Sequence, residues 1–459
     1  MKTYRLFNII SILIFLSFTL LLFFSCNSTE PEIKEKEKSS IEAIDVSCDE
    51  IWLKLKVGEI DLPAAGVIRI DGTKEKLFSV TIKDTILYID SLEVNRYYKF
   101  QVILANNGDT LTGNEATVKT LDTTSHNFSY ETHEFGDYSS SSLLDVAIID
   151  ENNIWAVGEI YMKDSLGNND PKRYNAVHWD GVKWEAERIY YYGACSAVNY
   201  PPLKAILTFS DTNIVVTNGG SIGWYNGKEI TLDCGVNLLL TGAVNRIWGT
   251  SINDIYIVGD AGNIAHYDGN NWTKIESGTN FHLTDISANI NGRVFISGIN
   301  MQESKGVLLR GNRSEGFAVM VNSGIINQSE LFNPKLYGEL QTVWVDDNGT
   351  VYTGGNILFW NKNNKWDYVK TMPENYIGGN QGASYRGFIY AINGNGSNDY
   401  IVAGDRNTLK HFNGKTWTQL GLPYSLTTGI MWWSVEQKGN IAVAVGVKGS
   451  KAFIIKLKR

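Results

Sequence analysis

The 459-residue sequence contains little cysteine, proline or histidine, with 4 Cys, 8 Pro and 6 His. No Cys-x-x-Cys pair occurs, so neither structural zinc nor thiol redox chemistry has support. Lys and Arg number 41 against 49 Asp and Glu, which gives a formal net charge of −8. Without an excess of positive charge the chain lacks the phosphate-neutralising surface on which nucleic-acid binding depends, and nucleic acid is excluded as an expected partner.

Glycine and aromatic residues are abundant instead. The sequence has 44 Gly, 13 Trp and 23 Tyr, and 43% of its residues are hydrophobic. That much apolar surface is enough for large cores, so global disorder is excluded. A chain rich in Gly and Trp and poor in Pro is typical of many short strands joined by tight turns. We therefore expect an all-β protein.

The only long apolar run lies at the N-terminus, at residues 6–24, and Lys2 and Arg5 precede it. A basic start, an apolar run and a small residue, Ser25, are the parts of a secretion signal. Cys26 follows directly, and this order resembles a bacterial lipoprotein signal, in which the cysteine thiol is acylated and becomes the mature N-terminus. An uncleaved signal anchor is the alternative, because the run is long enough to span a bilayer.

The lipoprotein resemblance implies a cellular location and an order of segments at the N-terminus. Residues 1–25 are expected to be the signal peptide, and residues 26–41 a polar, charged tether without apolar periodicity. The folded part then lies outside the cytoplasm, anchored through lipid at Cys26 to the bacterial outer membrane, in the periplasm or on the cell surface.

Residues 42–122 predict a small β-sandwich. Short runs alternate between apolar and polar residues with period two and are separated by Gly, Asn and Asp turns. Their length and number suit a seven-stranded immunoglobulin-like sandwich. Leu92 and Tyr98 have the spacing of a tyrosine corner, and Leu55 takes the place of a core Trp, so this stretch resembles a fibronectin type III domain. The resemblance implies a spacer or a protein-contact module.

Residues 126–459 contain a repeat. Its clearest unit, residues 244–275, carries Trp-Gly-x-Ser-x-Asn-Asp-x-Tyr-x-Val-Gly and divides into four strands. A glycine that closes the second strand recurs in seven units: Gly158, Gly219, Gly259, Gly298, Gly354, Gly404 and Gly446. Four strands per unit are typical of a propeller blade, so the repeat predicts a seven-bladed β-propeller. It resembles the propeller repeats of secreted bacterial proteins.

The last unit supplies only three strands before the chain ends at Arg459. One strand-like segment, residues 126–135, has no partner in the first unit. We predict that residues 126–135 pair with the C-terminal blade as its fourth strand and so close the ring.

The long insertions of the repeat predict the binding face. All of them lie between the second and third strands of a unit or between its fourth strand and the next unit, and alternating strand direction brings these loops to one face. They are rich in Tyr, Asn, Gly and Gln, which suit a glycan or protein surface, although the same residues could merely pack the loops onto the blades. The ligand-binding candidates are Tyr161, Arg173, Tyr190, Tyr191, Tyr192, Tyr200, Tyr337, Tyr376, Asn380, Gln381, Tyr385 and Arg386.

Catalytic signals are weak. The insertions carry scattered acids, whereas a glycosidase needs two carboxylates facing one bond. His178, His266 and His411 occupy equivalent positions in three separate units, so they cannot converge on one metal ion. We expect no metal and no cofactor, and a monomeric, non-enzymatic module that binds a glycan or protein. The alternative is a carbohydrate-active enzyme, glycosidase or glycosyltransferase-like, with its site at the channel mouth.

Two cysteines lie one repeat apart. Cys195 and Cys234 could pair in an oxidising compartment, the alternative being two separate thiols.

Overall fold

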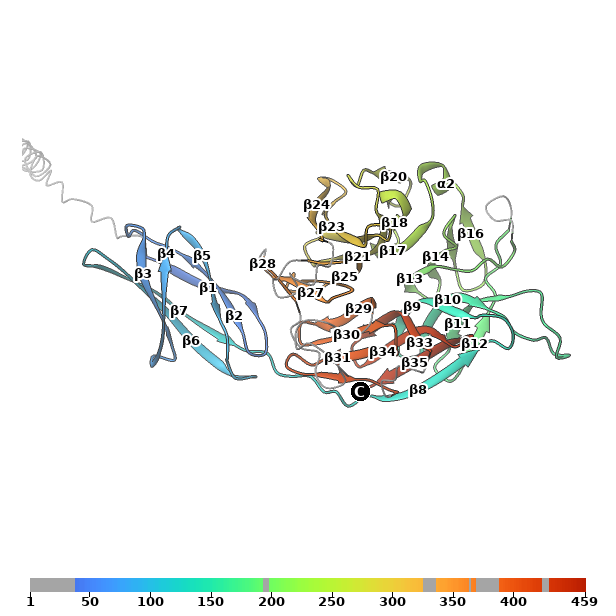
Figure 1. Cartoon of the computed structure of the whole chain (residues 1–459), viewed down its shortest axis with the longest axis horizontal. Coiled ribbons are helices and arrows are strands. Elements are labelled where there is room, and N and C mark those ends of the chain that lie inside the picture. The colour runs from blue at the N-terminus through green and yellow to red at the C-terminus, as the bar shows by residue number, and fades with distance from the viewer. Residues whose placement is uncertain (1–37, 193–197, 325–335, 363–364, 369–387, 423–428) are drawn as a thin grey trace, which may run out of the picture. The chain divides into compact units, whose positions relative to one another are not determined.

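The computed structural model describes residues 38–192, 198–324, 336–362, 365–368, 388–422 and 429–459. The chain is all-β, as expected, and divides into two compact units, the first built mainly from β1–β7 and the second from β8–β35 (Figure 1). Within the described ranges, no helix has the length and apolar character needed to cross a membrane.

The first unit contains two antiparallel sheets, with strand orders β1-β2-β5 and β4-β3-β6-β7. Side chains that alternate along each strand determine which residues form the core. In β6 every second side chain from Tyr98 to Leu104 is buried. The strands are β1 (Ser40–Val46), β2 (Ile51–Lys56), β3 (Ala64–Ile70), β4 (Lys74–Val80), β5 (Asp84–Ile89), β6 (Tyr97–Asn106) and β7 (Asp109–Lys119).

The second unit consists of seven four-stranded antiparallel sheets, numbered here in chain order. Sheets 1 to 3 are β9 (Ser142–Asp150), β10 (Asn153–Ile160), β11 (Tyr174–Trp179) and β12 (Trp184–Glu187); β13 (Ala205–Ser210), β14 (Asn213–Thr217), β15 (Ile222–Tyr225) and β16 (Ile230–Asp233); and β17 (Val244–Ser251), β18 (Asp254–Gly259), β19 (Ile264–Tyr267) and β20 (Trp272–Ile275). Two short helical turns, α2 (Val236–Leu239) and η1 (Asp260–Gly262), interrupt the connections.

The remaining sheets repeat the pattern. Sheets 4 and 5 are β21 (His282–Ala288), β22 (Val294–Asn300), β23 (Lys305–Asn312) and β24 (Gly316–Asn322), then β25 (Leu340–Val345), β26 (Val351–Gly355), β27 (Phe359–Lys362) and β28 (Lys365–Tyr368). Sheets 6 and 7 are β29 (Ile389–Gly396), β30 (Asp399–Gly404), β31 (Leu409–Phe412) and β32 (Trp417–Gln419), then β33 (Ile430–Lys438), β34 (Ile441–Lys448), β35 (Lys451–Lys458) and β8 (Ser129–Phe135).

The sheets are arranged in a closed ring. The first strand of each sheet contacts the first strand of the next, and β33 of sheet 7 contacts β9 of sheet 1. Residues of all seven first strands line one central cavity. This is the arrangement of a β-propeller, with the first strands innermost around a channel.

The core lies between neighbouring sheets and follows from the period-two alternation of each strand. In β9, Val146 and Ile148 pack against sheet 7, whereas Ala147 packs against sheet 2. Each of the seven pairs of adjacent sheets shares one such apolar cluster. Because every sheet buries both faces against neighbours, no sheet has a complete core alone.

The recurring glycine of the repeat has a steric cause. A Cβ on Gly158 would lie 2.1 Å from the backbone oxygen of Ser142, and one on Gly259 would lie 2.1 Å from that of Ala243. These glycines sit at a bulge in the pairing of the first two strands. In sheet 5 the corresponding residue is Gly355 rather than Gly354, because Gly355 pairs with Leu340 at the bulge.

The ring is closed by the first and last strands of the second unit. β8 pairs antiparallel with β35, in a register that places Phe135 opposite Ala452 and Ser129 opposite Lys458. This is the pairing expected of residues 126–135. The last two strands in the order of sheet 7, β35 and β8, therefore come from the end and the beginning of the second unit.

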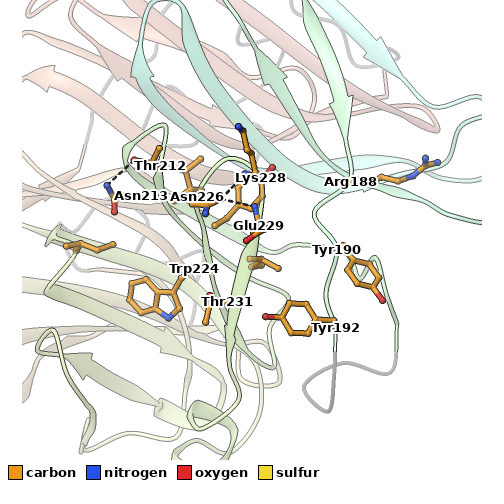
Figure 2. Close-up of a pocket in the computed structure, with 14 residues that line it drawn as sticks. Arg188, Tyr190, Tyr192, Thr212, Asn213, Trp224, Asn226, Lys228, Glu229 and Thr231 are labelled. Carbon is orange, nitrogen blue, oxygen red and sulfur yellow. Dashed lines mark hydrogen bonds between the residues drawn. The ribbon is translucent and has the colours of Figure 1, made fainter.

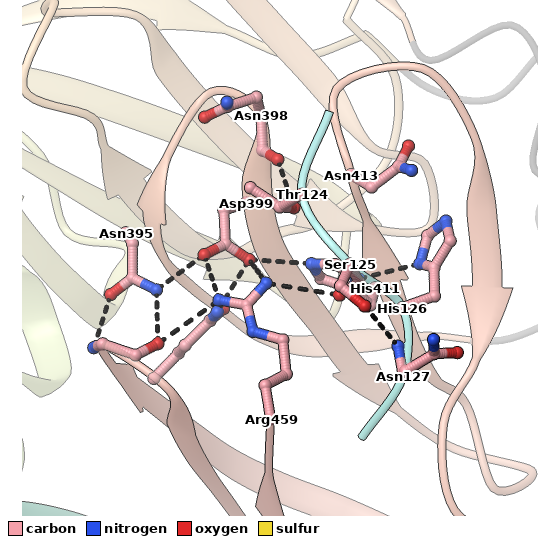
Figure 3. A network of polar contacts seen from close by, with 12 residues as sticks. Thr124, Ser125, His126, Asn127, Asn395, Asn398, Asp399, His411, Asn413 and Arg459 are labelled. Carbon is pink, nitrogen blue, oxygen red and sulfur yellow. Dashed lines mark hydrogen bonds and ion pairs between the residues drawn. The ribbon is translucent and has the colours of Figure 1, made fainter. Parts of the chain in front are cut away.

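Arg459, the last residue, adds a second link between the C-terminus and sheet 6 (Figure 3). Its guanidinium donates to the two oxygens of Asp399 in sheet 6 at 2.5 and 3.0 Å, and His411 donates to the same carboxylate at 2.8 Å. Burial alone would raise the pKa of Asp399, but these hydrogen bonds outweigh it and hold that pKa far below its usual range. His126, just ahead of β8, contacts His411 through their Nδ1 atoms at 2.8 Å.

Candidate ligand-binding pocket

Exposure alternates along the Tyr190–Tyr192 segment, which follows the last strand of sheet 1. Tyr191 points inward and is 1% exposed in the cluster between sheets 1 and 2, whereas Tyr190 and Tyr192 are 46% and 51% exposed. The two exposed rings are nearly parallel, with centroids 6.4 Å apart. The Tyr200 ring lies 5.5 Å from that of Tyr190. The result is a small aromatic platform on the surface.

Tyr190 and Tyr192 of this platform line one side of a pocket of about 600 Å³ (Figure 2). The facing wall comes from sheet 2 and its turns. The lining residues are Arg188, Tyr190, Tyr192, Thr212, Asn213, Ile214, Trp224, Tyr225, Asn226, Lys228, Glu229, Ile230, Thr231 and Ile252. The volume lies in the range of small-ligand sites, and the lining combines aromatic and aliphatic side chains with an equal number of polar or charged ones.

Arg188 is held rigidly at the edge of this pocket. Its guanidinium pairs with Asp170 at 2.5 Å, donates to the backbone oxygen of Lys172 at 2.7 Å and stacks over the Tyr174 ring at 3.7 Å. The backbone N–H of Lys172, together with Arg188, lowers the pKa of the Asp170 carboxyl. The positive charge of Arg188 is therefore largely neutralised before any ligand arrives.

Asn226 shapes the opposite side. Its side-chain oxygen accepts hydrogen bonds from the backbone N–H groups of Lys228 at 3.0 Å and Glu229 at 2.7 Å, which closes the β15–β16 hairpin. Gly227 takes the positive φ of 87° that this turn needs. The turn projects Lys228 and Glu229, whose side chains are exposed and of opposite charge, at the pocket rim.

One position in the third strand of each sheet carries different side chains in different sheets. In three sheets a third-strand histidine bonds through Nε2 to an acid or amide that begins the second strand. The pairs are His178 with Asn153 at 2.9 Å, His266 with Asp254 at 2.7 Å and His411 with Asp399 at 2.8 Å. These contacts agree with a structural role for the three histidines.

In sheet 2 the same two positions hold Trp224 and Asn213, and both line the pocket. In sheet 5 the same third-strand position is also a tryptophan, Trp360. The Trp224 ring is partly exposed and lies 5.0 Å from Tyr267, and no acceptor in the described part of the chain bonds its indole N–H. A repeat position used elsewhere for internal bonding is thus available to a ligand in sheet 2.

A second polar site occupies the central channel, a cavity of about 350 Å³. Arg246 from sheet 3 pairs with Asp145 of sheet 1 at 2.5 Å and with Asp285 of sheet 4 at 3.2 Å. Burial raises the pKa of Asp285, although Arg246 opposes the shift. Burial also raises the pKa of Glu436, in sheet 7, to about 7. In the described ranges, no group of three His, Cys, Asp or Glu side chains is placed to hold a metal ion.

The predicted binding residues have different outcomes. Tyr190 and Tyr192 line the pocket, and Tyr200 joins their platform. Tyr191 and Tyr337, also predicted as ligand-binding candidates, are instead buried in the clusters between sheets, where they are 1% and 4% exposed. The predicted residues that lie outside the described ranges are Tyr376, Asn380, Gln381, Tyr385 and Arg386.

Tyr161 and Arg173 form a separate, internally satisfied group. The Glu159 carboxylate bonds both the Tyr161 hydroxyl and the Arg173 guanidinium, and the guanidinium lies 5.5 Å from the Tyr161 ring centre. Neither residue lines the pocket. Their polar groups already bond Glu159, so this group offers less to a ligand than the platform does.

Sequence reasoning missed the sheet 2 wall of the pocket. It expected the ligand at loops of one face, whereas Thr212, Asn213, Asn226 and Lys228 belong to the short turns of the other face. The signal that could have found the wall was present: aligning the repeats shows Trp224 where three units have histidine.

A disulfide prediction concerns the same region. Cys234, the residue after β16, is disulfide-bonded, whereas Cys48 is free; Cys195 lies outside the described residues. We expect Cys195 to be the partner of Cys234. Mass spectrometry of a non-reduced protease digest should find one cross-linked peptide pair that disappears with reductant and in Cys195→Ser. A Cys26–Cys234 pair in the digest would contradict the assignment.

Comparisons with known proteins support the fold. No protein-family model and no curated protein sequence matches the chain. Among solved structures, YCF48 bound to D1 peptide is 12% identical with a TM-score of 0.50, covering 72% of this chain and 95% of that one. The extracellular domain of a putative one-component system from B. thetaiotaomicron is 14% identical with a TM-score of 0.47, covering 71% and 39%. The WD40 β-propeller domain of Doa1 is 13% identical with a TM-score of 0.44, covering 72% and 97%. At 12% identity the likeness to YCF48 concerns fold alone, and together with the closed ring of sheets it confirms the expected β-propeller.

Proposed function

We propose that the chain is a lipid-anchored extracytoplasmic binding protein, in which a seven-bladed propeller presents the sheet 2 pocket to a glycan and a fibronectin type III-like sandwich serves as its spacer. The observation that carries the ligand site is the replacement of the histidine pair by Trp224 and Asn213, both on a pocket that also contains Tyr190 and Tyr192. The acylated cysteine is Cys26, and the membrane is the outer membrane.

The chemistry of the pocket suits a sugar. A pyranose has apolar C–H faces that stack on aromatic rings, and hydroxyl groups that both donate and accept hydrogen bonds. The pocket offers rings at Tyr190, Tyr192 and Trp224, and the rim combines Lys228 with Glu229, so it has no strong net charge. Of the described lining residues only Glu229 is a carboxylic acid, which supports binding rather than hydrolysis by a carboxylate pair.

The test is a glycan array with the soluble chain from Ser40, followed by titration of any hit. Tyr190→Ala/Tyr192→Ala is expected to weaken binding about 5- to 150-fold, because two lost aromatic contacts at about 0.5–1.5 kcal/mol each amount to about 1–3 kcal/mol. The melting temperature should stay close to that of the parent, since both rings are exposed. Tyr97→Ala, another exposed tyrosine but outside the pocket lining, is the matched control and should leave affinity unchanged.

Two outcomes would redirect the proposal. Unchanged affinity in the double variant would remove this pocket as the site. If chromatography of the products showed that the bound oligosaccharide had been cleaved or transferred, the result would favour the carbohydrate-active enzyme.

A peptide is the second candidate ligand, because the YCF48 structure is of that protein bound to D1 peptide. No glycan hit, together with saturable binding of an extended peptide that the double variant abolishes, would support it.

A further inference from the structure

The inner strands place side chains in two successive rings along the channel. The first ring is formed by the residue that follows the bulge in the first strand of a sheet. It contains Asp145, Arg246, Asp285, Thr342 and Ser434. Two residues further along each strand, the second ring contains Trp248, Ser287, Trp344, Asn393 and Glu436. All of the second-ring residues line the 350 Å³ cavity.

The first ring is satisfied internally. Asp145 accepts from Arg246, from the Ser434 hydroxyl at 2.8 Å and from the backbone N–H of Ile206 at 3.0 Å. Asp285 accepts from the Thr342 hydroxyl at 2.6 Å as well as from Arg246. The charges of this ring are therefore committed to one another.

Glu436 in the second ring is not satisfied in this way. One of its oxygens, Oε2, accepts from the backbone N–H of Ile148 at 2.9 Å, while Oε1 has no partner in the described part of the chain. The side chain is half-buried at the wall of the channel cavity, and its partial removal from water there raises its pKa. An acceptor oxygen therefore lies unused beside an open volume.

The charges around this oxygen favour a cation. Three carboxyl groups, those of Asp145, Asp285 and Glu436, share this region with two cations, Arg246 and Lys438. The ammonium group of Lys438 already donates to the backbone oxygen of Ile149 at 2.8 Å. An anion would meet three carboxyl groups. A divalent metal needs several oxygen ligands, and among the described residues no three His, Cys, Asp or Glu side chains are grouped to hold one. Trp248 and Trp344 line the same cavity, and indole rings attract organic cations.

We propose that the central channel is a second binding site, in which Glu436 Oε1 receives a primary alkylammonium group in the ring formed with Trp248, Ser287, Trp344 and Asn393. The group can belong to a free amine or to a lysine side chain of a partner. This site is independent of the sheet 2 pocket and of the ligand proposed there.

Glu436 must be ionised to bind the cation. Its pKa of about 7 is raised above that of an exposed glutamate, so the carboxyl is protonated below pH 7 and charged above it. The Asp145 carboxylate disfavours the charged form, and Lys438 and Arg246 favour it. Ammonium affinity is therefore expected to rise as the pH increases through 7.

The experiment is calorimetric titration of the full chain, in non-ionic detergent, with n-butylammonium. Saturable binding is expected, with no binding of butyrate or n-butanol. Glu436→Gln keeps the shape and an acceptor for Ile148 but removes the charge, and should weaken binding at least about tenfold and abolish its pH dependence. Glu303→Gln, an exposed acid outside the cavity lining, is the control and should bind as the parent does.

Three results would overturn the proposal: no saturable binding of n-butylammonium up to about 10 mM, equal affinity in Glu436→Gln when its melting curve shows a folded protein, or preference for butyrate. A Gly-Gly-Lys-Gly-Gly peptide in the same titration distinguishes the source of the group. Competition between peptide and amine supports a lysine of a partner, whereas binding of the amine alone supports a free amine.

Discussion

Ending the chain at Ser450 is expected to abolish the cooperative unfolding transition of the whole second unit. The deletion removes β35, which pairs with β34 on one side and with β8 on the other. Buried residues from Ala452 to Leu457 leave the clusters that sheet 7 shares with sheets 1 and 6. Because every sheet depends on two neighbours, the loss should propagate around the ring rather than stay local.

Circular dichroism and calorimetry would measure this result, with a graded series as control. Removing only Arg459 keeps the β35–β8 pairing but breaks the ion pair to Asp399, so a lower melting temperature with a cooperative transition is expected. Deleting residues 129–135 should resemble the Ser450 truncation, since it removes the opposite half of the closure. An unchanged melting curve in either large deletion would show that the ring does not require closure.

Replacing Arg246 by alanine is expected to destabilise the second unit by about 3–5 kcal/mol, the usual cost of removing one partner of a buried ion pair. The arginine is the cation between Asp145 and Asp285, whose side chains are only 3% and 13% exposed. Without Arg246, these two largely buried carboxyl groups lose the cation that lies between them. Urea denaturation of parent and variant measures the difference.

The pH dependence of this loss follows from the Asp285 carboxyl. Burial already raises its pKa, and removal of Arg246 should raise it further. Between the unfolded and folded pKa values the native state then binds more protons, so stability falls as pH rises. The deficit of Arg246→Ala should therefore be larger at pH 8 than at pH 5. A deficit independent of pH would indicate lost packing rather than lost charge.

Arg293→Ala is the matched control for this variant. Arg293 pairs with Glu315, but both side chains are substantially exposed, so less than about 1 kcal/mol should be lost. If Arg246→Ala behaved like Arg293→Ala, the channel network would have no structural importance.

The candidate site was only partly predictable from sequence. The tyrosine run marked a binding loop, but which of three adjacent tyrosines is buried depends on the direction in which the segment leaves sheet 1. Tyr191 fills the cluster between sheets 1 and 2, whereas its neighbours Tyr190 and Tyr192 are exposed. Tyr337 is buried together with its neighbour Leu336 in the cluster between sheets 4 and 5.

The channel was less predictable still. Asp145, Arg246 and Asp285 are separated by up to 140 residues, and no local pattern distinguishes them from surface charges. They meet because each occupies the same register position in its innermost strand, and the ring brings those positions together.

The sequence by itself determined the strand pattern, because alternation, turn residues and the bulge glycine act within a few residues of one another. It also determined which end segments complete the last sheet, since three strands need a fourth. Only the tertiary structure decided which turns of sheet 2 face Tyr190 and Tyr192, and which charges share the channel. Those relationships depend on the angle at which successive sheets pack, a quantity set by all the contacts between sheets rather than by any single segment.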